Sequence, residues 1–367
     1  MSNIVIFSHF KPYPPNHGFA HRVWHLALAL KKEDKKVIII HNAIHGKNKK
    51  IVKNMQGIKI IQLPFLFKFM QKKHFIFQAN PLFLLELLKL NKKGKIGIVE
   101  IELPYMILIA LFLRLFGKKL VYDAHGVEYE WHRVMYKKKN IVLFLIKLIE
   151  TLALRLSNKV ICCSKNDRNT FINEFKIKKE KIDVVPSLID VDNFKKIKPF
   201  KFKKKTVLFI GSQLHPANKE AIDIIYNKII PAVNKKIKNV QFCFIGKDPP
   251  HWLKGKNILV LGEIKDVKSY ILGSDLCIAP IFKGCGIRIK ILEYMAGKKC
   301  VIATTKAAEG LDVGQGKNII LKDDIIDFSN AIVYFLRNKN KAKKIGLEGY
   351  KLVKKEYDIN SLKILFI

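Results

Sequence analysis

The chain alternates short apolar runs with longer segments whose apolar positions recur at helical spacing. A first strand is predicted over residues 3–8, followed by a Pro/Gly loop over residues 11–18 and a helix over residues 20–31. Further strand-length runs lie at residues 37–41, 58–63, 96–102, 119–123, 159–164 and 182–186. Helix-length segments lie between several of them, at residues 81–90, 104–116, 140–156 and 165–175. This alternation indicates a parallel sheet covered by helices on both faces.

The same pattern starts again after a lysine-rich stretch at residues 195–205. The new strands are predicted at residues 206–212, 241–246, 258–262, 276–281, 300–304 and 318–321. We therefore expect an N-terminal α/β domain over residues 1–190 and a C-terminal one over residues 191–350. Residues 351–367 are expected to form a helix that crosses back to the first domain. Because ligands of open α/β sheets bind beyond the carboxyl ends of the strands, a cleft between the two domains is the expected site.

The turn Gly284-Cys285-Gly286 carries the clearest chemical signal. It joins a predicted strand to a helical pattern that begins at once, and glycines allow a ligand to approach the backbone closely. The free N–H groups of a helix start suit an anion. Arg288 and Lys290 fall in the predicted first turn, where cations are unfavourable unless an anion binds. The pattern therefore predicts a phosphate site. The alternative is an exposed Lys290–Glu293 surface pair beside a solvated Arg288.

Length and composition define the class of protein. A chain of 367 residues is too long for one ordinary core, which favours two domains. A hydrophobic content of 49% and a mean hydropathy of +0.07 are typical of globular proteins. The net charge of +38 fits binding to a polyanion, either nucleic acid or an acidic membrane. Because the lysines are spread along the chain, AT-rich coding explains most of this charge, and attraction to anionic membranes follows from it.

A cytoplasmic protein, at the inner face of the cell membrane if it meets lipid, is the expectation for this chain. The first apolar run, at residues 3–7, lacks the basic flank of a secretory leader, and the run at residues 103–113 is too short to span a bilayer. Five of the six cysteines lie in strand-like apolar contexts typical of buried thiols in a reducing compartment: Cys162, Cys163, Cys243, Cys277 and Cys300.

Two patterns resemble metal sites, and neither predicts one. Asp190-Val191-Asp192 spells an Asp-x-Asp motif, but it falls in the interdomain segment and is interpreted as a turn. His17, His21 and His25 share i,i+4 spacing, but no carboxylate completes a ligand set and His17 is expected in a loop.

The order of motifs resembles family 4 of the retaining glycosyltransferases, whose GT-B fold has two Rossmann-like domains facing across a cleft. The resemblance is strongest over residues 205–312, where Gly286-Ile287-Arg288-Ile289-Lys290-Ile291-Leu292-Glu293 is similar to the signature of one branch. It includes the segments 207–218, 227–231, 242–246, 261–263 and 275–280, together with a linker phrase at residues 185–194. The first half matches less closely, through the Gly18 loop and the run from Asp123 to Glu128.

The resemblance implies a hexosyltransferase that moves a sugar from a UDP- or GDP-linked donor to a growing glycan or lipid-linked acceptor in cell-envelope polysaccharide synthesis. Retention in such enzymes involves front-face attack, for which no metal or other cofactor is expected. The catalytic residues implied are His125, which contacts the donor sugar, and Arg288 and Lys290, which stabilise the diphosphate. The donor-binding residues implied are Gly211, Ser212, Gly284, Cys285, Gly286, Ile287 and Glu293, with Glu293 accepting hydrogen bonds from the ribose. The acceptor-side residues implied are Gly18, Asp123 and Glu128, the last two either orienting His125 or binding the acceptor.

One position departs from the family pattern, because Cys285 stands where the wider family has the first glutamate of Glu-x7-Glu. This leaves open the identity of the sugar and, to a lesser degree, activity itself. Two other functions are compatible with the sequence: a nucleotide-sugar epimerase on the same fold, or a non-catalytic basic scaffold that binds membrane or nucleic acid. Nucleic acid is not expected as a partner of the transferase. Residues 104–119 and 137–155 mix apolar runs with Lys and Arg, as either interfacial helices or core helices flanked by lysines do.

Overall fold

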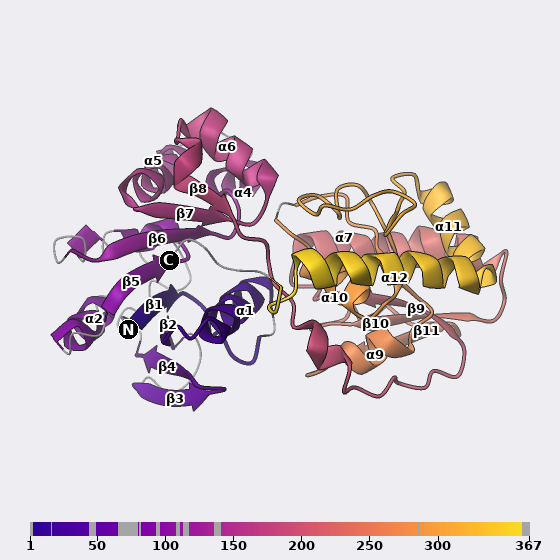
Figure 1. Cartoon of the computed structure of the whole chain (residues 1–367). Helices are drawn as coiled ribbons and strands as arrows, with labels where there is room; N and C mark the ends of the chain where they lie inside the picture. Colours follow the sequence, from indigo (N-terminus) through magenta and orange to yellow (C-terminus); the bar gives the residue numbers. More distant parts are fainter. Residues whose placement is uncertain are drawn as a thin grey trace. The chain divides into compact units, whose positions relative to one another are not determined.

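The computed structural model forms two compact units, which consist of Met1–Leu188 with Leu362–Ile367, and of Ile189–Ser361. It describes residues 3–15, 17–43, 49–64, 80, 82–92, 96–107, 111–112, 117–135, 141–284 and 286–361. Each unit is an α/β domain with its own sheet and its own buried core (Figure 1). The expected fold class of two Rossmann-like domains is thereby confirmed.

The described residues of the first unit form an eight-stranded sheet in the order β3-β4-β2-β1-β5-β6-β7-β8. Every strand pairs in parallel with its neighbours except β3, which runs antiparallel to β4. The strands are β1 (Asn3–Ser8), β2 (Val37–Asn42), β3 (Ile51–Met55), β4 (Ile58–Leu63), β5 (Ile96–Ile101), β6 (Lys119–Ala124), β7 (Lys159–Cys162) and β8 (Ile182–Val184). The edge strand β3 was not predicted, because its short run of side chains is largely exposed and carries polar residues in place of an aliphatic core run.

The helices of the first unit are α1 (Gly18–Lys32), α2 (Leu82–Lys92), α4 (Glu128–Met135), α5 (Ile141–Leu156) and α6 (Lys165–Phe175). Figure 1 shows α4, α5 and α6 gathered beside β7 and β8. The described residues of this unit also form two short 3-10 turns, η3 (Pro104–Met106) and η4 (Lys179–Lys181). The helix predicted over residues 104–116 therefore begins as a 3-10 turn, and most of its remainder lies outside the described residues.

The second unit contains a six-stranded, fully parallel sheet in the order β11-β10-β9-β12-β13-β14. Its strands are β9 (Lys205–Ile210), β10 (Val240–Ile245), β11 (Ile258–Gly262), β12 (Leu276–Ala279), β13 (Cys300–Ala303) and β14 (Ile320–Leu321). The helical elements are η5 (Val191–Phe194), α7 (Pro216–Ile224), η6 (Ile225–Ile229), α8 (Ile230–Asn234), α9 (Lys268–Gly273), α10 (Ile289–Ala296), α11 (Ile325–Arg337) and α12 (Lys339–Glu356). The central strands are aliphatic and buried on both faces, as parallel strands covered by helices must be.

The helix predicted to start at residue 351 begins earlier, at Lys339. Residues 351–356 are the end of α12, a single helix that starts at Lys339 and packs against α10 and β13 within the second unit. Helix α12 stays in this unit because its buried face, which includes Ile345 and Val353, completes the second core. Residues 362–367 lie outside the described residues. Among the helices that the structure describes, none combines the length and apolar character needed to cross a bilayer.

Candidate active site

The second sheet has a topological switch point between β9 and β12, where the strand order reverses. Chains that leave the carboxyl ends of two such strands diverge to opposite faces, which opens a crevice for a ligand. Gly211 and Ser212 directly follow β9, and the glycine turn at residues 284–286 follows β12. A salt bridge of 2.9 Å between Glu220 of α7 and Lys283 joins the two segments. The fold therefore brings the predicted donor-side segments to one edge of the sheet.

Lys290 lies at the centre of these donor-side segments. Its Nζ donates a hydrogen bond to Asn218 Oδ1 at 2.7 Å and lies 4.5 Å from the centroid of the Phe209 ring. Asn218 in turn donates from Nδ2 to the carbonyl of Ser212 at 3.0 Å. A Cβ atom added to Gly211 would lie 2.9 Å from Lys290 Nζ and 2.8 Å from Asn218 Oδ1, so a larger residue here would displace these two side chains.

The environment of Lys290 changes its charge. Burial lowers its pKa to about 7, and the nearby positive charge of Arg288 acts in the same direction, whereas Glu293 opposes them. At neutral pH, and without ligand, the Lys290 side chain is therefore uncharged in a large fraction of the protein molecules. An anion placed beside Nζ would stabilise the ammonium form.

Arg288 is the N-cap residue of α10 rather than part of its first turn, which corrects the prediction. Its guanidinium folds back on the glycine turn, donating from Nη1 to the carbonyl of Gly286 at 2.6 Å and from Nη2 to that of Lys283 at 3.3 Å. Gly284 and Gly286 have φ angles of +97° and +83°, which L side chains rarely adopt. Ile287 packs against the core of the unit, and Cys285 lies outside the described residues.

Glu293 lies in the second turn of α10 and is partly buried. Burial raises its pKa to about 7, while the charges of Lys268 and Lys290 act against the increase. The alternative of an exposed Lys290–Glu293 surface pair is wrong for Lys290, whose ammonium group is turned to Asn218 and Phe209. In the turn that follows β9, the hydroxyl of Ser212 accepts a hydrogen bond from Leu214 N at 3.2 Å.

His215 is a residue of this site to which the sequence had assigned no role. It precedes Pro216 as the N-cap residue of α7. Partial burial lowers the pKa of its imidazole, and the positive charges of Arg288 and Lys290 lower it further. His215 therefore lies within electrostatic range of both cations. The signal available in the sequence was a His-Pro pair four residues after the glycine that ends the strand.

In the first unit, His125 follows β6 and lies beside the start of α1. Its ring stacks on Phe19, with 5.1 Å between the ring centroids, and its Nε2 lies 3.5 Å from Asp123 Oδ2. Gly18 is the first residue of α1 and not part of a loop, because the side chain of His17 accepts from Ala20 N and caps the helix, which begins two residues earlier than predicted.

Asp123 is fully buried, so its carboxylate cannot contact an acceptor. Nε of Arg22 donates to both carboxylate oxygens at 2.9 Å, and Nη1 donates to the carbonyl of Val185 at 2.8 Å. Burial opposes ionisation of Asp123, but the Arg22 guanidinium outweighs it and the pKa is lowered. Of the two roles predicted for Asp123, only the orientation of His125 fits this geometry.

Glu128 begins α4 and has other contacts. Its Oε2 lies 3.6 Å from Nε2 of His132 and 3.5 Å from the hydroxyl of Tyr105. The backbone N–H groups of Glu128 and Tyr129 donate to the buried carboxyl of Glu150 on α5, at 2.9 and 2.8 Å. These contacts give Glu128 a structural setting at the start of α4, and its role on the acceptor side stays a prediction.

Two buried glutamates at the switch point of the first sheet, between β1 and β5, were also missed. Glu100 and Glu102 are each 1% exposed, and Glu102 accepts from the hydroxyl of Ser8 at 3.1 Å. Within the described parts of the chain, the other carboxyl oxygen of Glu102 and both of Glu100 have no hydrogen-bond partner. Burial raises both pKa values well above 4.5, and the negative charge of Asp123 adds to the effect. The protonated form of both carboxyl groups is therefore favoured relative to a carboxyl group in water. The Glu-x-Glu pattern at a strand end was the available signal.

The two metal-like patterns have local structural partners. The side chain of Asp190 caps η5 by accepting from Asn193 N at 3.3 Å, and Asp192 pairs with Lys195 at 2.6 Å. His17 caps α1, and Nδ1 of His25 lies 2.8 Å from the carbonyl oxygen of His21. Over the ranges that the structure describes, no group of three or more His, Cys, Asp or Glu side chains could hold a metal ion.

Two models of known protein families match this chain. A family model described as Glycosyltransferase Family 4 matches residues 17–193, and one described as Glycosyl transferases group 1 matches residues 204–338. The chain is a glycosyltransferase with the GT-B fold. This supports the resemblance at the level of the family and favours the transferase over the epimerase and the scaffold. The narrower branch signature stays a prediction.

Among relatives of this glycosyltransferase, an uncharacterized 44.6 kDa protein in the cps region of Klebsiella pneumoniae is 24% identical, covering 98% of this chain and 97% of the relative. The UDP-Gal:alpha-D-GlcNAc-diphosphoundecaprenol alpha-1,3-galactosyltransferase of Escherichia coli is 26% identical, covering 77% and 78%. Among solved structures, sucrose-phosphate synthase from Thermosynechococcus elongatus has a TM-score of 0.78 at 15% identity, covering 98% of this chain and 96% of that one. That likeness shows the fold alone.

Proposed function

We propose that this glycosyltransferase moves a hexose, with retention of anomeric configuration, from a UDP- or GDP-sugar to a growing glycan or lipid-linked acceptor during synthesis of a cell-envelope polysaccharide. The observation that carries the proposal is the group formed by Lys290, Arg288 and the glycine turns at the switch point of the second sheet. The Escherichia coli relative is named for a UDP-sugar donor and a diphosphoundecaprenol acceptor, and the Klebsiella pneumoniae relative for a cps region.

In the proposed donor complex, the diphosphate binds against the N-terminus of α10. Backbone N–H groups near Gly286 and the side chains of Arg288 and Lys290 compensate the charge that grows on the leaving group. Gly211 and Ser212 let the donor approach the end of β9, and Glu293 accepts hydrogen bonds from the ribose. Lys290 gains most from this contact, because its ammonium form is disfavoured until the anion arrives.

In the proposed transfer step, the acceptor hydroxyl attacks the anomeric carbon on the face from which the nucleotide diphosphate departs. The bond between the anomeric carbon and the phosphate oxygen breaks, the new glycosidic bond forms, and the acceptor proton passes to a phosphate oxygen. No carboxylate nucleophile is required for this route, in contrast to retaining hydrolases. His125, held by Asp123 and Phe19, is proposed to contact the donor sugar, and no metal or other cofactor is proposed.

A lipid-linked acceptor would place the reaction at the cytoplasmic face of the cell membrane. We therefore infer a peripheral attachment, which the net charge of +38 would favour on a surface rich in anionic lipids.

Titration calorimetry with UDP, GDP and a panel of nucleotide sugars tests the donor site. We expect at least one nucleotide to bind, and Arg288→Ala to weaken binding about tenfold to a hundredfold, as loss of a charge-assisted hydrogen bond does. Lys351→Ala is the control, because Lys351 lies on α12 and pairs with Glu348. If no nucleotide or nucleotide sugar binds at millimolar concentration, the proposed function is wrong.

A turnover assay then separates the transferase from the epimerase. The transferase consumes its nucleotide sugar in proportion to added glycan or lipid-linked acceptor, whereas an epimerase would convert the donor with no acceptor present.

A further inference from the structure

Helix α5 is apolar on two opposite faces. One face, formed by Leu143, Ile146, Ala153 and Leu154, is buried within the first unit. On the opposite face a stripe of large apolar side chains remains in contact with water: Ile141 (68% exposed), Phe144 (62%), Leu145 (38%), Leu148 (44%) and Leu152 (37%). At 100° per residue these five positions fall within about one quarter to one third of the helix circumference. A contiguous exposed patch of this kind marks a surface that binds a partner.

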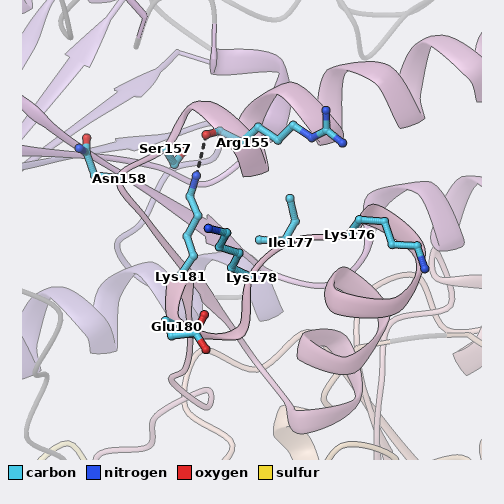
Figure 2. A pocket seen from close by; sticks show the side chains of 8 residues that line it. All are labelled: Arg155, Ser157, Asn158, Lys176, Ile177, Lys178, Glu180 and Lys181. Carbon is cyan, nitrogen blue, oxygen red and sulfur yellow. Dashed lines mark hydrogen bonds between the residues drawn. The ribbon is translucent and has the colours of Figure 1, made fainter.

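The chemistry around the stripe is basic. The next position on the same side of the helix is the exposed Arg155, which lines an open hollow of about 550 Å³ (Figure 2). Lys176, Lys178 and Lys181 also line the hollow, with Glu180 as its one carboxylate among the described lining residues. Nζ of Lys181, the last residue of η4, donates a hydrogen bond to the carbonyl of Arg155 at 2.6 Å (Figure 2). This hydrogen bond joins the lysine-bearing segment of the hollow to the end of α5.

We propose that the exposed stripe of α5 and the basic hollow at its end together form a membrane-docking surface that recognises anionic phospholipid. The apolar side chains would enter the boundary between headgroups and acyl chains, and the hollow would hold a lipid phosphate. This combination of an aliphatic helix face with a flanking Lys/Arg cluster matches the requirements of interfacial binding. The inference rests on the proposed function and extends it, because it assigns the attachment that a lipid-linked acceptor requires to particular residues.

Charge favours a membrane over a second copy of the chain. A second copy of the chain would present the same basic side chains, whereas anionic lipid supplies the charge that complements Arg155, Lys176 and Lys178. The one acidic residue of α5, Glu150, is buried and its carboxyl binds the N–H groups of Glu128 and Tyr129. The stripe therefore presents no negative charge of its own to an anionic surface.

Helix α5 is linked through Glu150 to the segment that follows His125. The carboxyl of Glu150 accepts from the N–H group of Glu128, which starts α4 three residues after His125. The hollow lies at the opposite, amino-terminal edge of the sheet, since Ser157 and Asn158 directly precede β7 and Lys181 directly precedes β8. Docking through the stripe and the hollow would therefore leave the carboxyl ends of the strands unoccupied.

Vesicle flotation tests the docking surface, using full-length protein with phosphatidylcholine vesicles that either contain or lack phosphatidylglycerol. We expect flotation only with the anionic vesicles and a decrease as salt rises. Phe144→Gln combined with Leu148→Gln should reduce the floated fraction at least tenfold, and Lys176→Glu combined with Lys178→Glu should reduce it to a similar extent. Ile326→Gln and the pair Lys343→Glu with Lys344→Glu are matched controls, because these residues are exposed on α11 and α12 of the second unit.

A second variant keeps the test independent of any folding defect. Phe144→Trp preserves an apolar side chain, and its added fluorescence should be quenched by brominated lipid in anionic vesicles. Flotation of the α5 variants at the level of the unchanged protein would overturn the proposal, as would added fluorescence in the Phe144→Trp protein that brominated lipid leaves unaffected. Loss of a dimer on light scattering without loss of flotation would assign the stripe to a second copy and likewise overturn it. Nucleotide binding measured on the same variants is expected to be unchanged, so failure of docking and failure of the donor site are separate results.

Discussion

Lys290 shows how tertiary surroundings redefine one residue. In water a lysine is fully protonated at neutral pH, yet burial near Arg288 brings the pKa of Lys290 to about 7. The sequence placed Lys290 in a Gly-Ile-Arg-x-Lys motif at a strand-to-helix turn and so predicted the contact with an anion. The side chains that contact its ammonium group, Phe209 and Asn218, belong to another strand and another helix.

Binding of UDP is expected to be coupled to uptake of a proton above pH 7. The diphosphate stabilises the ammonium form of Lys290, so the complex holds more protons than the free protein between about pH 7 and the higher pKa of the complex. Affinity should consequently fall as pH rises through this range. Calorimetry in two buffers of different ionisation enthalpy measures the protons taken up per UDP bound.

Lys290→Arg is the control for this coupling, because arginine stays charged at all these pH values. The variant should lose the proton uptake that Lys290 contributes. This loss distinguishes the contribution of Lys290 from those of Glu293 and His215, whose pKa values are also shifted in this site. Equal proton uptake in Lys290→Arg and the unchanged protein would contradict the prediction.

At the scale of elements, helix α12 illustrates what a pattern along the chain leaves open. Its lysine-rich sequence has few apolar residues, and from the sequence we expected only a terminal segment beginning at residue 351. The structure shows one helix from Lys339 to Glu356 whose glycines allow close packing on the second unit. A Cβ on Gly346 would lie 2.2 Å from the carbonyl oxygen of Lys298, and one on Gly349 would lie 3.1 Å from that of Asn318.

Gly346→Ala is expected to destabilise the second unit by about 1–3 kcal/mol, the usual cost of overpacking. Alanine stabilises an exposed helix interior by about 1 kcal/mol relative to glycine, so a destabilised variant would show that the clash with Lys298 outweighs helix propensity. Urea denaturation measures the change in the free energy of unfolding.

Gly314→Ala serves as the comparison, because its nearest new contact would be an ordinary 3.4 Å to the Cβ of Lys317. This variant should leave the free energy of unfolding within about 0.5 kcal/mol of the parent value. A Gly346→Ala protein as stable as Gly314→Ala would show that α12 shifts freely on the unit beneath it.

At the scale of the whole molecule, the chain divides its chemistry between two units that fold around separate cores. Arg288 and Lys290 belong to the second unit, and His125 with the buried acids belongs to the first. The apolar stripe and basic hollow also belong to the first unit.

UDP is therefore expected to protect backbone amides mainly in the second unit, at residues 211–218 and 284–293. Hydrogen exchange followed by mass spectrometry measures this, since a ligand that binds only the folded site suppresses its local opening. Arg288→Ala should lose most of the protection at a matched UDP concentration. Protection confined to the first unit would place the nucleotide elsewhere and contradict the donor site.

The sequence by itself determined the class of fold, the strands of both described sheets except the edge strand β3, and the glycine turn with Arg288 and Lys290. These follow from local periodicity and from glycine chemistry, which act over a few neighbouring residues. Tertiary structure decided that Asp123 is buried beside Arg22, that Glu128 faces His132, that His215 joins the cations, and that the pKa values of Glu100 and Glu102 are raised. Each of those outcomes depends on charges and burial supplied by segments far apart in the chain, and no pattern along one segment records them.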